Sequence, residues 1–162
     1  MAEQVPNEAV DYMTSNLLGM LLKKGGPRII SLGQAEGLFS AVQAANSAMG
    51  DLEVFQEIGK AYSADAVLTG YVYRWREREG TEYAVNRPAS VAFDLYLIKT
   101  DDGVIIWKER FEKTQQSLSE NLLDLGTFLK GKGRWMEAKE LADIGLAHLI
   151  ETWSEGEYGR KD

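Results

Sequence analysis

Several residue types are scarce in this chain of 162 residues, and each scarcity excludes a class of protein. It has no cysteine, so it can form neither a disulfide nor a thiolate metal site. It holds 18 Lys and Arg against 25 Asp and Glu, and the net charge of -7 disfavours a nucleic-acid partner, which needs a basic face. No apolar stretch approaches the length of a membrane-spanning helix.

The composition is that of a folded protein. Hydrophobic residues make up 44% and charged residues 27% of the chain, which argues against disorder. The length is typical of one domain with a sizeable core. We expect a single domain over residues 1–153, followed by a polar tail over residues 154–162.

Apolar spacing and turn residues divide the chain into helices and strands. Helical periodicity and capping residues predict helices at residues 8–24, 34–48, 51–62, 118–129 and 135–153. Alternating or continuous apolar residues predict strands at residues 28–32, 67–77, 91–97 and 105–111. The turn at residues 100–103 contains Asp102 and Gly103, a pair that suits a tight hairpin.

These elements predict an α/β fold of the mixed α+β kind, a single mixed β-sheet with helices packed on it. Residues 66–70 are apolar on both faces, which favours a central place in the sheet. The two helices between the strand at 28–32 and the strand at 67–77 make a crossover, which is right-handed if these strands are parallel neighbours. The later strands are joined by hairpins and would be antiparallel.

A short motif resembles a known group of proteins. Residues 64–70 read Ala-Asp-Ala-Val-Leu-Thr-Gly, follow a helix and open the long strand. This segment resembles the CsgG/LpoB/TolB N-terminal-like group of bacterial envelope lipoprotein domains, and residues 119–135 look like an uncharacterised lipoprotein branch of it. The resemblance implies a non-enzymatic periplasmic domain, anchored to the outer membrane, that mediates protein–protein interaction or assembly at the cell envelope.

The chain differs from this group in two features, the start of the chain and the connection at residues 76–88. Its members usually carry a strand before the first helix, whereas this chain begins almost at that helix. We expect the natural gene to encode an upstream signal segment and a lipidation cysteine, so that the protein reaches the membrane only through a lipid anchor that is absent from this chain. The alternative is a cytoplasmic protein, because the N-terminus as given has no signal features. Without the group's first strand, one edge of the sheet would lack a neighbour. We expect a second copy of the chain to fill this edge in a homodimer, or else residues 4–6 to fold back and pair with it. The connection at residues 76–88 is too short and charged for a transmembrane hairpin.

Two patterns invite catalytic or ligand-binding interpretations. Residues from Gly126 to Gly133 have the spacing of a phosphate-binding loop, but Gly133 stands where Ser or Thr would ligate Mg²⁺. A small-ligand or nucleotide-binding domain using this loop is the alternative function. His148 is the only histidine and is typical of an exposed helix position. We therefore expect no enzyme activity, no cofactor, no metal site and no catalytic residues.

Aromatic and arginine side chains supply the candidate contacts with other envelope proteins. Such residues concentrate in binding hot spots. The candidates are Trp75, Tyr83, Arg87 and Trp135, although Trp75 and Trp135 are also typical of residues that cap the core. Residues 77–87 combine charge, aromatic residues and Gly80, which fits either a solvated loop or a recognition loop.

Overall fold

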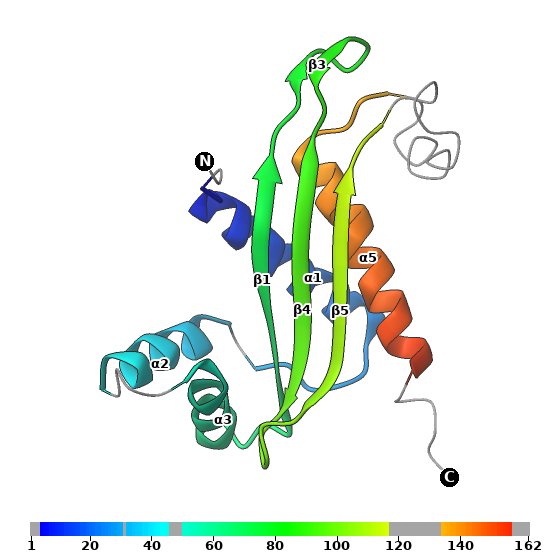
Figure 1. Ribbon diagram of the computed structural model, residues 1–162. Coiled ribbons are helices and arrows are strands. Elements are labelled where there is room, and N and C mark those ends of the chain that lie inside the picture. Colours follow the sequence, from blue (N-terminus) through cyan, green and yellow to red (C-terminus); the bar gives the residue numbers. More distant parts are fainter. Residues whose placement is uncertain (1–3, 31, 46–49, 117–133, 157–162) are drawn as a thin grey trace. The chain divides into compact units, whose positions relative to one another are not determined.

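Figure 1 presents a computed structural model of the chain, in which residues 4–30, 32–45, 50–116 and 134–156 are described. These ranges hold the helices α1 (Asn7–Lys24), α2 (Leu32–Ala45), α3 (Asp51–Ala61) and α5 (Ala138–Gly156). The strands are β1 (Ala66–Arg76), β2 (Glu79–Gly80), β3 (Val85–Arg87), β4 (Ser90–Lys99) and β5 (Ile105–Thr114). The predicted fold class is confirmed as mixed α+β, with helices packed on a sheet. The helix expected at residues 118–129 lies outside the described residues.

The main sheet has the strand order β1-β4-β5 and is antiparallel, and β2 pairs with β3 in a separate hairpin. The central position expected for residues 66–70 is wrong, because β4 is the middle strand. β1 and β5 lie on either side of β4, joined to it through the β2-β3 hairpin and through the turn at residues 100–103. Most of β4 is buried on both faces, including the alternating residues Phe93 and Asp94.

The strand expected at residues 28–32, and with it the parallel pairing, does not form. Residues 28–30 have no regular secondary structure, and Leu32 is already the first residue of α2. Gly25 and Gly26 adopt φ values of 71° and 123°, and Pro27 has no backbone N–H to donate. Too few residues remain between this turn and the helix to build a strand.

The chain divides into two compact units, and the main sheet contributes part of its strands to each. The first unit holds residues 1–24, 71–94 and 110–162, and the second holds residues 25–70 and 95–109. The single domain expected over residues 1–153 stays a prediction, and α5 extends into the expected polar tail as far as Gly156.

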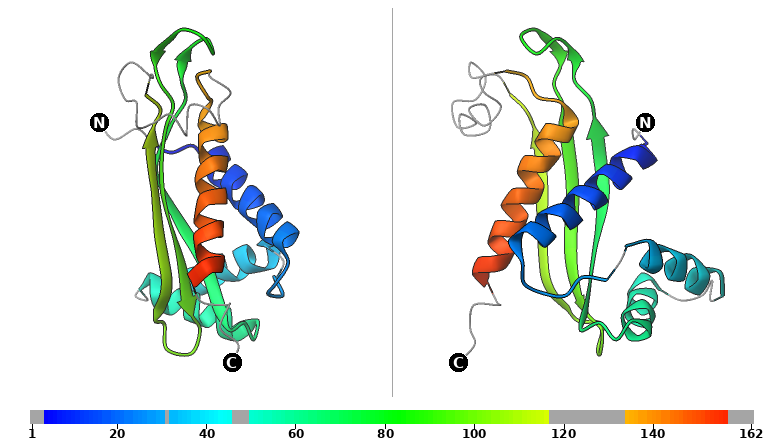
Figure 2. Two further views of the ribbon diagram at one scale, coloured as in Figure 1. Left: turned by 90° about the vertical axis from the view of Figure 1, so that its right-hand side faces the viewer. Right: turned by 180° about the vertical axis from the view of Figure 1, so that it is seen from behind.

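In the first unit, α1 and α5 cover one face of the strands (Figure 2). Phe93 on β4 and Phe111 on β5 have ring centroids 5.4 Å apart. Gly145 lets α5 approach this pair, since a Cβ there would lie 2.6 Å from the Phe111 ring. Apolar side chains complete the core, including the fully buried Leu141 and Leu146.

The two helices of this unit are also joined by polar side chains. The Tyr12 hydroxyl donates to Asp143, with distances of 2.9 and 2.8 Å to its two carboxylate oxygens. The Asn16 amide donates to the same carboxylate. Burial, followed by the hydrogen bond to Asp143, raises the pKa of Tyr12 to about 12. Tyr12 therefore stays protonated and acts as a donor that holds α1 on α5.

The second unit contains α2, α3 and the turn between β4 and β5. Phe39 and Phe55 stack at 5.8 Å between ring centroids and join the two helices. The predicted turn at residues 100–103 is confirmed, and Gly103 supplies the positive φ of 71° that it needs. Thr100 is buried and its backbone N–H donates to Asp65 at 3.0 Å.

Candidate docking site at the hairpin head

The charged connection after β1 is an ordered hairpin rather than an open loop. β2 and β3 pair with Glu79 opposite Arg87 and Gly80 opposite Val85, with an irregularity between Glu79 and Gly80. Gly80 has a φ of 115°, and a Cβ there would lie 2.5 Å from the Ala84 carbonyl oxygen. Only glycine fits this position. We call residues 78–87 the hairpin head.

Short hydrogen bonds fix the loop at the tip of the hairpin head. The Thr81 N–H donates to the Ala84 carbonyl at 2.8 Å. The Thr81 hydroxyl accepts from the N–H groups of Tyr83 and Ala84 at 3.3 and 3.0 Å. Thr81 therefore closes the turn twice, through its backbone and through its side chain. Tyr83 projects from this closed turn with 79% of its surface exposed.

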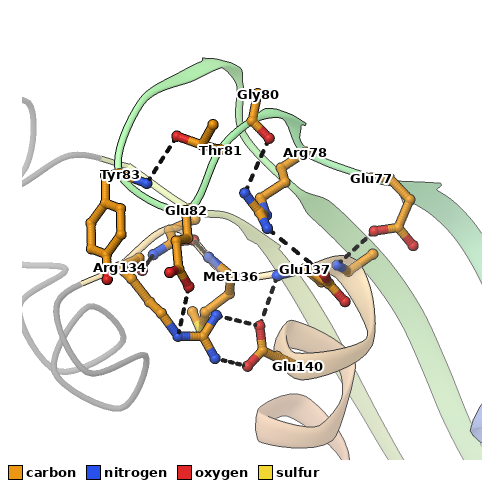
Figure 3. Close-up of polar contacts among 12 residues, drawn as sticks. Glu77, Arg78, Gly80, Thr81, Glu82, Tyr83, Arg134, Met136, Glu137 and Glu140 are labelled. Atoms are coloured by element: carbon orange, nitrogen blue, oxygen red, sulfur yellow. Dashed lines mark hydrogen bonds and ion pairs between the residues drawn. The ribbon is translucent and has the colours of Figure 1, made fainter.

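The residues that precede α5 hold the head from below (Figure 3). The Trp135 N–H donates to the Glu82 carbonyl at 2.8 Å. Arg134 lies 3.8 Å from the Glu82 carboxylate and makes a two-pronged contact with Glu140, one prong of which is 3.0 Å long. This hydrogen bonding lowers the pKa of Glu140 and raises that of Arg134. The tip is thereby anchored to the first turn of α5.

Two side chains from the strands fix where α5 begins. Glu77 accepts from the Ala138 N–H at 3.1 Å and from the Trp75 indole N–H at 3.0 Å. Gln115 is fully buried; it accepts from the Met136 N–H at 2.7 Å and donates to the Arg134 carbonyl at 3.0 Å. Residues 135–137 have no regular secondary structure, and the helix starts at Ala138 and not at the expected Trp135.

The four predicted contact residues lie in or beside this site, in different environments. Tyr83 is exposed, whereas Trp75 is 6% exposed and packs edge-on against Tyr12 at 6.2 Å. Arg87 is half-buried and forms an ion pair with Glu79 at 3.3 Å. Trp135 is half-buried beneath the head. Trp75 thus belongs to the core, and Tyr83 is the most exposed of the four residues.

An open cavity of about 460 Å³ lies beside the head. Its charged lining residues are Glu8, Glu77, Glu79, Arg78, Arg87 and Lys139. Carboxylates and cationic groups occur in equal number on this wall, so its charge selects neither an anion nor a cation. Trp75 and Ala9 form part of its apolar lining.

The described residues offer no cluster of three or more His, Asp or Glu side chains that could hold a metal ion. His148 is exposed on α5, and Asp143, five residues before it, is bound to Tyr12. The loop from Gly126 to Gly133 lies outside the described residues. Among the helices that are described, none is both long and apolar enough to cross a membrane.

No protein-family model and no curated protein matches the chain. Among solved structures, the chain is similar to a PelC dodecamer from Paraburkholderia phytofirmans, at 18% identity and a TM-score of 0.40. That match covers 72% of this chain and 70% of the other. A PelC dodecamer with a leucine-to-methionine substitution, from the same organism, is 20% identical with a TM-score of 0.35, covering 72% and 74% of the two chains. Such low TM-scores establish no common function.

Proposed function

We propose that this chain is a non-catalytic domain that binds another protein of the bacterial cell envelope through its hairpin head. The observation that carries the proposal is Tyr83, which is 79% exposed at the tip of a turn fixed by hydrogen bonds on both sides. Tyrosine is one of the residue types enriched in binding hot spots, and here it stands on an ordered turn.

The ordered turn that carries Tyr83 would let this chain bind a partner without first ordering a loop. Tyrosine has few rotatable bonds, so it loses little conformational entropy when it is bound. The backbone of the turn is already ordered by Thr81 and anchored through Glu82, so binding does not have to order the loop. Arg87 and Trp135, half-buried at its flanks, would form the rim of the contact.

The proposed compartment is the periplasm, with attachment to the outer membrane by a lipid on residues upstream of Met1. This part of the proposal rests on the resemblance of residues 64–70 to envelope lipoprotein domains. Fractionation of cells that express the natural gene, combined with fatty-acid labelling, tests it. Labelled protein in the outer-membrane fraction supports the proposal, and unlabelled protein in the cytoplasm contradicts it.

Site-specific photo-crosslinking in cells tests the docking surface. A photoreactive amino acid replaces Tyr83 in one strain and Lys23, exposed near the end of α1, in the control strain. We expect an adduct with one envelope protein from position 83 and none from position 23. The same adduct should decrease when Thr81→Ala removes the two hydrogen bonds that the Thr81 hydroxyl accepts in the turn. Equal crosslinking from both positions, or none from position 83, would contradict a docking role for the head.

The alternative is a small-ligand or nucleotide-binding domain that uses the loop from Gly126 to Gly133. A ligand that binds only the folded state raises the melting temperature. A thermal-shift screen with nucleotides and metal ions therefore separates the two functions. A shift that is lost in Lys132→Ala would favour the alternative.

A further inference from the structure

We propose that β5 pairs with β5 of a second copy of this chain, antiparallel, with Phe111 opposite Phe111 of that copy. β5 is the last strand in the order β1-β4-β5, so among the described residues no strand lies beside its outer edge. It runs for ten residues without proline or glycine. An unprotected edge of this length is a template for another strand, because its N–H and C=O groups face outward.

The charge order of β5 is complementary to itself about Phe111. Residues 109–113 read Glu-Arg-Phe-Glu-Lys. In an antiparallel pair centred on Phe111, Arg110 stands opposite Glu112 of the second copy, and Glu109 stands opposite Lys113. Each contact occurs twice by symmetry, and every one joins opposite charges. If the pair were centred on Arg110 or on Glu112 instead, that residue would stand opposite the same residue of the second copy. Like charges would then meet at the centre of the pair, which is destabilising.

The alternating charges of β5 are typical of a sheet edge that can pair with another strand, and not of an edge that is protected from pairing. Protected edges carry proline, bulges or like charges that repel a second strand. The opposite edge of the sheet fits that description better, because the charged residues of β1 are Arg74 and Arg76, both positive. Gly70 also lies within β1 and weakens it as a pairing strand. β5 is thus the edge whose sequence selects a second copy.

Side chains at the centre of the proposed pair already have contacts within the chain, since Arg110 lies 3.7 Å from Asp94 on β4 and Glu112 lies 2.9 Å from Arg74 on β1. Phe111 is half-buried, packed on Phe93 and against Gly145, so the second copy would cover the rest of its ring. The side chains of Arg110 and Glu112 are 56% and 48% exposed. They already lie 3.3 Å apart within the chain, and the second copy would extend this pair into a row of alternating charges.

Charge reversal at Glu109 and Lys113 tests the register without disturbing the Arg110–Glu112 pair. Glu109→Lys and Lys113→Glu each place like charges opposite one another twice, so each alone should weaken the dimer by on the order of tenfold. The double variant Glu109→Lys/Lys113→Glu restores opposite charges and should recover the dimer. Sedimentation equilibrium measures all four proteins over a wide concentration range, with melting temperatures as the control for folding.

Disulfide trapping provides a second measurement, since the chain has no cysteine of its own. A mixture of Arg110→Cys and Glu112→Cys should form a mixed disulfide under mild oxidation. A mixture of Lys108→Cys and Glu112→Cys, which the register separates, should not. A monomeric natural chain at every concentration would overturn the proposal. So would a dimer that both single reversals leave intact, or one that the double variant fails to restore. These outcomes are independent of Tyr83, so either proposal can fail alone.

Discussion

Replacing Glu77 by alanine should destabilise the first unit more than its surface position suggests. The Glu77 carboxylate accepts from the Ala138 N–H at the start of α5 and from the Trp75 indole at the end of β1. Loss of an N-terminal helix cap costs about 1 kcal/mol. The Trp75 side chain is almost fully buried, and a buried donor left without an acceptor costs roughly 1–3 kcal/mol.

Together these losses give a decrease of about 2–4 kcal/mol in the free energy of unfolding, measured by urea denaturation. For a chain of this size the melting temperature should fall by roughly 4–16 °C. Glu79→Ala is the matched control. It removes an equivalent carboxylate two residues away, but its ion pair with Arg87 joins side chains that are 59% and 42% exposed and contributes only about 0–1 kcal/mol.

A double-mutant cycle isolates the part that comes from tryptophan. Trp75→Phe keeps an aromatic ring in the core but removes the N–H. In that background Glu77→Ala should cost only the helix-cap contribution of about 1 kcal/mol. If Glu77→Ala is no more destabilising than Glu79→Ala, or costs the same with and without the Trp75 indole, then Glu77 does not join β1 to α5 as described.

Three further perturbations have expected results. Gly80→Ala should cost about 1–3 kcal/mol by straining the hairpin head and should increase amide exchange there; Gly19→Ala on α1, where nothing lies within 4 Å of the added methyl, should be neutral or stabilising. Because the pKa of Tyr12 rises from 10.0 to about 12 on folding, its contribution is complete below pH 10 and is lost as the pH rises towards 12. Denaturation at a series of pH values should therefore show the stability difference between the natural chain and Tyr12→Phe shrinking across that interval, and a constant difference would contradict it. The pKa of Glu140 is lowered mainly by Arg134, so Glu140→Gln should abolish a loss of stability that otherwise sets in below pH 4.5.

The sequence predicted those parts of the fold that local patterns determine. Period-two alternation located β4 and β5, and the Asp102-Gly103 pair located the turn between them. The order of the strands was harder, because an apolar run such as residues 66–70 is compatible with both a central and an edge position. The strand expected at residues 28–32 was wrong for a related reason. Two isoleucines fit a β pattern, but the pattern does not show that the Gly-Gly-Pro turn and the start of α2 leave too few residues for a strand.

The candidate site was only partly predictable, because its supports join residues far apart in the sequence. Tyr83, Arg87 and Trp135 were found by residue type, but the hairpin that carries the first two has almost no apolar alternation. Gly80, within a charged segment, was the one local sign of a tight turn. The Glu77 cap on Ala138 spans 61 residues, and Gln115 reaches Met136 over 21. A single glutamate or glutamine in a polar stretch gives no sign of such a distant partner.

These long-range caps bear on how a docking function could be lost. The hairpin head is ordered by the hydrogen bonds of Thr81 and is anchored to residues 134 and 135 through Glu82. Substitutions at Gln115 or Glu140 should therefore weaken partner binding even though neither side chain lies at the tip. A substitution at Tyr83 should weaken binding while leaving the melting temperature unchanged, because its exposed ring contributes little to the core. Measuring both quantities on both kinds of variant separates a residue that contacts the partner from one that positions the contact.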